Sequence, residues 1–116
     1  MTDAARLADI LERIDRIQRA TKGGKGAFFA SEVIQDAVIR NLEVIGEAAK
    51  TLSSRAQRQI SGVPWREMAR FRDLAIHRYG RVLADEVWAI VSGDLMRIRR
   101  EISAGTAHRR DRSKPR

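Results

Sequence analysis

Apolar residues recur along most of this chain at spacings of three and four, the periodicity of an amphipathic α-helix. The first segment carries such a stripe behind Thr2, a suitable N-cap residue. The residues of this stripe are Leu7, Ile10, Leu11, Ile14 and Ile17. No alternating strand pattern and no internal repeat occurs, so the sequence predicts an all-α protein.

Glycine and proline residues divide the pattern into segments. The run TKGGKG at 21–26 predicts a loop, and Ser31 is suited to cap a second long helix that reaches Leu52. This helix has a broad apolar face that includes Val33, and Gly46 in its middle favours close packing against another helix. Segment 53–64 predicts only one or two helical turns.

Two further helices are predicted, one from Trp65 to Tyr79 with Gly80 as its stop, and one from about Leu83 to Ser103. The chain therefore has four substantial helices and a short extra one. Short connections favour antiparallel neighbours, so we expect an up-down four-helix bundle.

Length and composition indicate a single folded domain, which we place at residues 1–104. The chain has no cysteine and no run of 18 apolar residues, and its first segment lacks the character of a signal peptide. We therefore expect no membrane association and a cytoplasmic protein. The net charge is +8, and residues 105–116, which we expect to be a disordered tail, contribute +4 of it. Such a tail either aids solubility or contacts a polyanion.

The stretch RFRDLAIHRYG at 70–80 holds one of two histidines and the only tyrosine. On a helix, Arg72 and Tyr79 fall within about 20° of each other. Asp73 and His77 are one turn apart. We therefore expect one edge of this helix to carry all four side chains.

These four side chains suit metal-independent cleavage of RNA. His77 can exchange a proton near neutral pH, and Asp73 can fix its tautomer. Arg72 can bind a phosphate through two parallel hydrogen bonds, and Tyr79 can orient a ligand or be modified. A structural interpretation is also open, because a histidine near a helix end often only complements the helix dipole. No cluster has metal-ligand spacing, so we expect no metal and no cofactor.

The segment RDLAIHRY resembles the Arg-x4-His-x-Tyr signature of HepT-like toxins, a branch of the HEPN superfamily. Three further stretches resemble that family, in family order over roughly residues 4–103, although the family often has Asn where this chain has Asp73. These stretches are AVIRNLEVIGEAAKTLS with its Gly46–Glu47 pair, VPWREMARFRD, and DEVWAIVSGDLMRIRREI.

The resemblance implies the HEPN helical bundle and a homodimer whose two copies of Arg72 and His77 line one cleft. It implies a toxin that cleaves RNA, with a minimal nucleotidyltransferase antitoxin (MntA-like) as partner. In that family the partner silences the toxin by transferring AMP to the motif tyrosine, here Tyr79. Two other hypotheses remain open: an inactive HEPN adaptor that binds nucleotide or the nucleotidyltransferase, and a small basic protein that coats nucleic acid.

The remaining candidates are more readily explained by structure than by chemistry. Phe28 and Phe29 are expected to anchor the glycine-rich loop to the core, and Trp65 and Trp88 to lie in the core or an interface. Glu47 is expected either to face the cleft or, more readily, to have a solvated or packing role. His108 lies in the tail and has no predicted partner.

Overall fold

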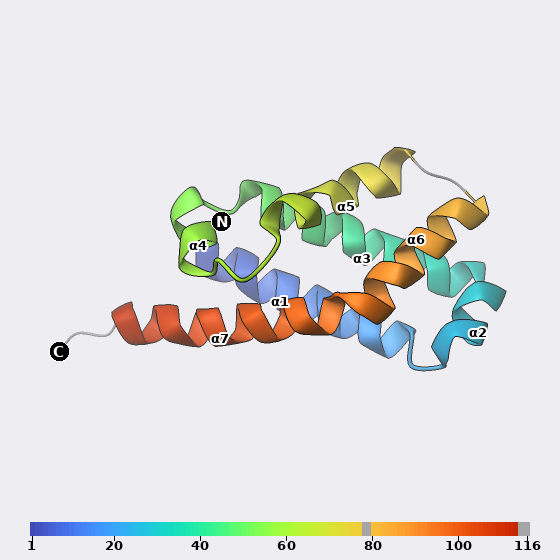
Figure 1. Cartoon of the computed structure of the whole chain (residues 1–116), viewed down its shortest axis with the longest axis horizontal. Coiled ribbons are helices and arrows are strands. Elements are labelled where there is room, and N and C mark those ends of the chain that lie inside the picture. The colour runs from blue at the N-terminus through green and yellow to red at the C-terminus, as the bar shows by residue number, and fades with distance from the viewer. Residues whose placement is uncertain (78–79, 114–116) are drawn as a thin grey trace.

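The computed structural model describes residues 1–77 and 80–113, and over these residues the chain forms seven α-helices and no strand (Figure 1). The all-α prediction is confirmed. The helices are α1 (Asp3–Ala20), α2 (Gly24–Ala30), α3 (Glu32–Thr51), α4 (Ser54–Gln59), α5 (Trp65–His77), α6 (Gly80–Gly93) and α7 (Leu95–Ser113).

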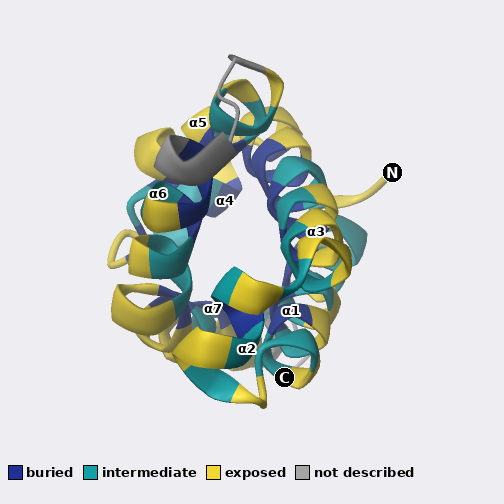
Figure 2. Ribbon diagram, turned by 90° about the vertical axis from the view of Figure 1, so that its right-hand side faces the viewer, coloured by how far each residue is buried: buried dark blue, intermediate teal, exposed yellow. Residues whose placement is uncertain are grey.

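The core lies between the inward faces of the long helices, and Figure 2 shows buried residues on those faces with exposed residues outside. Four of the five apolar residues predicted for α1 are fully buried, and Leu11 is partly buried against them. Most of the predicted face of α3 is also in the core, but Val33 is 80% exposed, Ala37 is exposed as well, and Ile34 and Val44 are only partly buried. Val33 lies in the first turn of α3.

Side-chain caps set the beginnings of three helices. The hydroxyl of Thr2 accepts a hydrogen bond from the Ala5 N–H, and Ser31 accepts one from Ile34. Both caps were predicted from sequence and are confirmed. Ser53 does the same for α4. Each cap satisfies one of the N–H groups that a helix start leaves without an intrahelical partner.

The structure differs from the sequence prediction around the glycine-rich run. The chain turns only at residues 21–23 and then forms α2, where we expected a loop through residue 26. Gly24 adopts a φ of 87°, a left-handed conformation that glycine takes without steric cost. Phe28 of α2 is fully buried, and its ring lies 5.2 Å from that of Trp88 on α6. The predicted anchoring role of Phe28 is confirmed.

The last predicted helix is two helices in the structure. A turn at Asp94, directly after Gly93, separates α6 from α7. Helix α7 continues to Ser113, past residue 105 where we expected the tail to begin. Residues 104–107 are Ala, Gly, Thr and Ala, and none of them forces a helix to stop.

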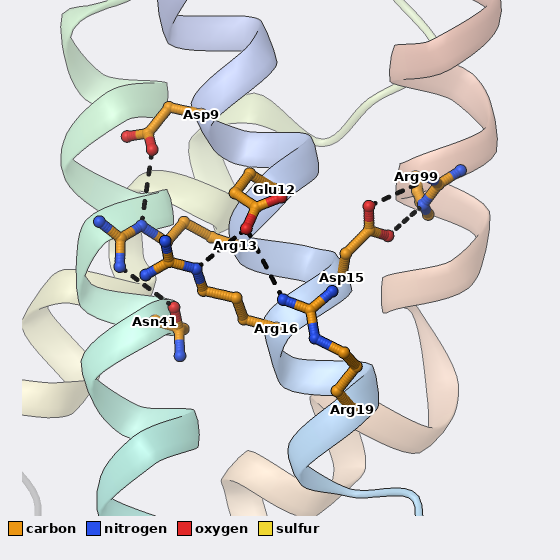
Figure 3. A network of polar contacts seen from close by, with 8 residues as sticks. All are labelled: Asp9, Glu12, Arg13, Asp15, Arg16, Arg19, Asn41 and Arg99. Carbon is orange, nitrogen blue, oxygen red and sulfur yellow. Dashed lines mark hydrogen bonds and ion pairs between the residues drawn. The ribbon is translucent and has the colours of Figure 1, made fainter.

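Polar contacts tie α1 to its neighbours on both sides (Figure 3). On one side Arg13 donates to the Asn41 side chain of α3 at 3.4 Å. On the other side Arg99 of α7 donates to Asp15, with Nε 2.7 Å from Oδ1. The helix α1 therefore lies between α3 and α7 and makes polar contacts with both. In the described part of the chain, no helix has the length and apolar character needed to cross a bilayer.

Candidate functional site

The helix α5 lies unusually close to α3 at the position of Arg72. A Cβ atom added to Gly46 of α3 would lie 2.6 Å from the backbone nitrogen of Arg72 and 3.1 Å from the Met68 carbonyl oxygen. These distances leave no room for a side chain at position 46. The predicted packing role of Gly46 is thus confirmed, and its effect is to fix where the Arg72 backbone lies.

The side chain of Arg72 forms an ion pair with Glu47, the residue that follows Gly46. Arg72 Nε lies 3.2 Å from Glu47 Oε2, and the two side chains are 40% and 55% exposed. The guanidinium is therefore held at the surface, where solvent and a ligand can reach it. Glu47 is exposed, as expected for a solvated residue, and its carboxylate also contacts Arg72, the main candidate residue. No local sequence pattern specifies this pairing, because it depends on how closely α3 and α5 approach at Gly46.

Arg72 and Glu47 line a hollow of about 340 Å³ that is built by three helices. Helix α3 contributes most of the lining residues and α1 contributes Arg6 and Asp9, while Arg72 is the lining residue from the described part of α5. The lining is rich in charge, with three arginines and three carboxylates. These charged residues are Arg6, Arg40, Arg72, Asp9, Glu43 and Glu47.

The other predicted site residues follow Arg72 along α5. Asp73 is exposed, and His77 is the last residue of the helix. The single edge that we expected for all four residues stays a prediction. Five positions of a regular helix turn by about 140°, so positions 72 and 77 begin on different sides of α5. The contacts of the His77 side chain, and the whole of Tyr79, lie outside the described residues.

The carboxylates of the described residues do not gather into a metal site. No group of three His, Cys, Asp or Glu side chains in that part of the chain is arranged to hold an ion. His108 is exposed on α7.

The two tryptophans have structural positions, as predicted. Trp65 is buried, and its indole N–H donates to the Ile60 carbonyl oxygen at 2.8 Å. Trp88 packs on the α2 phenylalanines, with ring-centroid distances of 5.2 Å to Phe28 and 6.4 Å to Phe29.

The fold and the site define an all-α bundle that presents an Arg-x4-His motif on α5, with the arginine paired to a carboxylate of α3. Residues 10–104 match the family described as "Ribonuclease HepT-like", which covers most of the chain. The chain belongs to this HepT-like family.

Several relatives carry names that agree with this family. The chain is 41% identical to the "Probable ribonuclease HepT" of Thermococcus cleftensis over 90 residues, which is 77% of this chain and 82% of that protein. It is 35% identical over 97 residues to a "Putative RNase" of Methanocaldococcus jannaschii, covering 83% of this chain and 89% of the relative.

The name of a larger relative from the same archaeon includes a second activity. It is called "Gamma-glutamylcyclotransferase and putative RNase", and it is 39% identical over 97 residues. That alignment covers 83% of this chain but only 44% of the relative, so this chain spans less than half of that protein's length. No solved structure matches the chain significantly.

Proposed function

We propose that this protein is the toxin component of a type VII toxin–antitoxin module and acts as a metal-independent endoribonuclease. The observation that carries the proposal is the position of Arg72. Its backbone is fixed by Gly46, its guanidinium is held at the surface by Glu47, and His77 follows on the same helix. The family match and the RNase names of several relatives support RNA as the substrate class.

In the proposed reaction the 2′-hydroxyl of one nucleotide attacks the adjacent phosphorus. His77 of one chain removes the hydroxyl proton as general base. Arg72 stabilises the charge that develops on the phosphate oxygens, using the planar fork that matches them. The bond from phosphorus to the 5′-oxygen breaks, and a protonated imidazole gives its proton to that leaving oxygen. The products are a 2′,3′-cyclic phosphate and a free 5′-hydroxyl.

A homodimer would supply both the general base and the general acid, because it contains two copies of His77. Each chain offers one His77, whereas the reaction needs both a base and an acid. Positions 72 and 77 also begin on different sides of α5, since five residues turn by about 140°. A twofold axis beside α5 would let the arginine of one chain face the histidine of its partner. Ile76, on the same helix, is 39% exposed and would be covered by such contact.

We further propose that a minimal nucleotidyltransferase antitoxin neutralises the toxin by transferring AMP to Tyr79. The tyrosine oxygen would attack the α-phosphorus of ATP, forming a phosphodiester and releasing pyrophosphate. The attached AMP adds a negative charge two residues beyond His77. An anion at that place would compete with the RNA phosphate for Arg72.

Two measurements test the proposal. Expression of the wild type should arrest growth, and purified protein should cleave single-stranded RNA in the presence of a chelator, whereas His77→Ala should do neither while its circular dichroism is unchanged. Equal growth arrest by both proteins would refute the assigned role of His77. Co-expression with a minimal nucleotidyltransferase of the proposed class should add one or more AMP masses, and Tyr79→Phe should abolish the gain.

The same measurements distinguish the second hypothesis. A catalytically inactive HEPN adaptor would bind the nucleotidyltransferase or a nucleotide, yet neither wild type nor variant would cut RNA. The surface position of the Arg72 guanidinium is compatible with both roles, because an arginine fork binds a nucleotide phosphate as well as a phosphodiester.

A further inference from the structure

The hollow beside Arg72 contains an arginine, Arg6 of α1, whose charge is not compensated by the carboxylates around it. Three carboxylates line the hollow, and each of them forms an ion pair with an arginine other than Arg6. These pairs are Asp9 with Arg13 at 3.5 Å, Glu43 with Arg40 at 3.4 Å and Glu47 with Arg72 at 3.2 Å. Of the three arginines that line the hollow, Arg6 is therefore the one in excess.

Asp9 has the helical spacing expected of a partner for Arg6, yet it is engaged elsewhere. The two residues lie three positions apart on α1, a spacing that brings side chains together. Asp9 instead pairs with Arg13, and Arg13 also donates to the side chain of the buried Asn41 at 3.4 Å (Figure 3). Asn41 is fixed in turn, because its amide donates to the Ala37 carbonyl oxygen at 2.8 Å. This network holds Asp9 to Arg13 and leaves Arg6 without it.

Asp3 is a further acidic residue near Arg6, and its oxygens are already occupied. They accept hydrogen bonds from the Ser53 hydroxyl at 2.6 Å and from the Ser53 N–H at 3.0 Å. These two hydrogen bonds lower the pKa of Asp3 most, and the charge of Arg6 contributes the smallest of the lowering effects. Among the residues that the structure describes, the half-buried Arg6 side chain makes no hydrogen bond and no ion pair. Its guanidinium can therefore bind an anion that enters the hollow.

The hollow has the size of a site for one nucleotide and not for a longer strand. Its volume of about 340 Å³ is at the lower end of the roughly 300–1,000 Å³ that ligand pockets span. Helix α3 lies between α1 and α5 and contacts both, so Arg6 and Arg72 reach the hollow from two different neighbours of α3 (Figure 1). Val44 and Ala48 of α3 add apolar lining against which a ribose or a base can pack.

We propose that the hollow binds the nucleotide next to the scissile phosphodiester, and that Arg6 binds the phosphate on the far side of that nucleotide. This inference rests on the proposed function, which makes the strand an RNA. Arg72 faces the phosphate that is cleaved, whereas Arg6 binds a neighbouring phosphate that stays intact. The planar fork of an arginine suits this role, because it binds phosphate oxygens through two parallel hydrogen bonds. Arg6 is thus a substrate-binding residue that sets the position of the strand.

Binding is tested in a His77→Ala background, where the RNA stays intact. The probe is a fluorescein-labelled single-stranded RNA of six nucleotides, and its anisotropy is followed between about 50 and 200 mM KCl, where phosphate contacts weaken strongly. Arg6→Gln removes the cation, and Arg6→Lys keeps it. The matched control is Arg16→Gln, which removes the same charge from α1 at a 48% exposed side chain outside the hollow. Circular dichroism confirms that each variant is folded.

Arg6→Gln should weaken RNA binding by about tenfold, the usual effect of losing one hydrogen bond to a charged group. The slope of log Kd against log salt should fall by about 0.7, because each phosphate contact on a single strand contributes that much. Arg6→Lys should keep the slope, and Arg16→Gln should leave both quantities unchanged. Equal losses in the two Gln variants would show a general charge effect and overturn the proposal, as would no loss in Arg6→Gln. Weaker binding of AMP with unchanged binding of RNA would overturn it too.

A second readout, with the histidine intact, separates this inference from the proposed function. The substrates are a dinucleotide with only the scissile phosphate and the same dinucleotide with one further phosphate at its 5′ or its 3′ end. At one of these ends the added phosphate should raise kcat/KM of the wild type about tenfold, and Arg6→Gln should lose this gain while Arg16→Gln keeps it.

The outcomes of the cleavage measurement are distinct. If the wild type cuts no substrate, the proposed function fails, and the binding measurement still decides the role of Arg6. If cleavage occurs and Arg6→Gln keeps the full gain, or the wild type gains nothing at either end, the Arg6 proposal fails alone.

Discussion

The guanidinium of Arg72 on α5 is held by the carboxylate of Glu47 on α3, with 3.2 Å between Nε and Oε2. Because both side chains are about half exposed, such a pair contributes only about 0–1 kcal/mol to folding. The main effect of the ion pair is to orient the guanidinium of Arg72. The pair involves Nε of Arg72, and in the proposed reaction the terminal nitrogens of the guanidinium bind the phosphate.

Replacing Glu47 should therefore affect RNA cleavage more than stability. Glu47→Ala should lower kcat about tenfold, because Arg72 then samples several rotamers. Glu47→Gln keeps an acceptor oxygen and should retain most of the activity. Urea midpoints of both variants should stay close to that of the wild type. Equal loss of activity in the two variants would show that charge, and not orientation, is what Glu47 provides.

Gly46→Ala should destabilise the protein by about 1–3 kcal/mol, the usual cost of overpacking a tight contact. The added carbon meets backbone atoms of α5, which cannot rotate away as a side chain would. Gly26→Ala is the matched control, since nothing lies within 4 Å of its added carbon. It should be neutral or stabilising by about 0.5–1 kcal/mol, as is usual for Gly to Ala in a helix. Urea denaturation measures both, and equal effects would contradict the packing argument.

Acid should weaken the contact between α1 and α7. The Arg99 hydrogen bond and charge hold the pKa of Asp15 below its ordinary value of 3.8. A carboxyl group with a lowered folded pKa stabilises the protein above its unfolded pKa, and this contribution is lost as the pH falls through the folded value. After screening by solvent the contribution is at most about 1 kcal/mol. The Tm difference between wild type and Asp15→Asn should thus be present at pH 6 and vanish near pH 2.

Ser53→Ala should cost about 1–2 kcal/mol, because one hydroxyl makes two contacts. It caps α4 by accepting from the Ala56 N–H, and it donates to Asp3 Oδ2 at 2.6 Å. Ser31→Ala removes the cap of α3 alone and should cost less. Thermal unfolding of the two variants checks the order. A larger loss for Ser31→Ala would contradict the added value of the Asp3 contact.

Much of this fold could be predicted because local signals and packing agree. The caps at Thr2 and Ser31, the apolar stripe of α1 and the role of Gly46 all follow from residue type and spacing. Helix α2 was missed because its glycines favour a loop, whereas burial of Phe28 against Trp88 stabilises the helix. Such tertiary contacts override local propensity.

The site was only partly accessible to sequence reasoning. Arg72 was identified from its motif, but its pairing with Glu47 depends on how closely α3 and α5 approach, which no local pattern specifies. The extension of α7 was missed for a similar reason, because charge suggested disorder while the contact of Gly105 with Ile60 orders the helix. The proposed roles of Arg72, His77, Asp73 and Tyr79 remain predictions.

The two tryptophans lie at different ends of the bundle, so their fluorescence can report on the unfolding of each end. Trp65 sits where α4 meets α5, and Trp88 sits against α2 at the other end of the molecule (Figure 1). Their emission therefore reports separately on the two ends. Proteins that retain a single indole, made by Trp65→Phe or Trp88→Phe, would reveal whether the ends melt together or whether one loosens before the other.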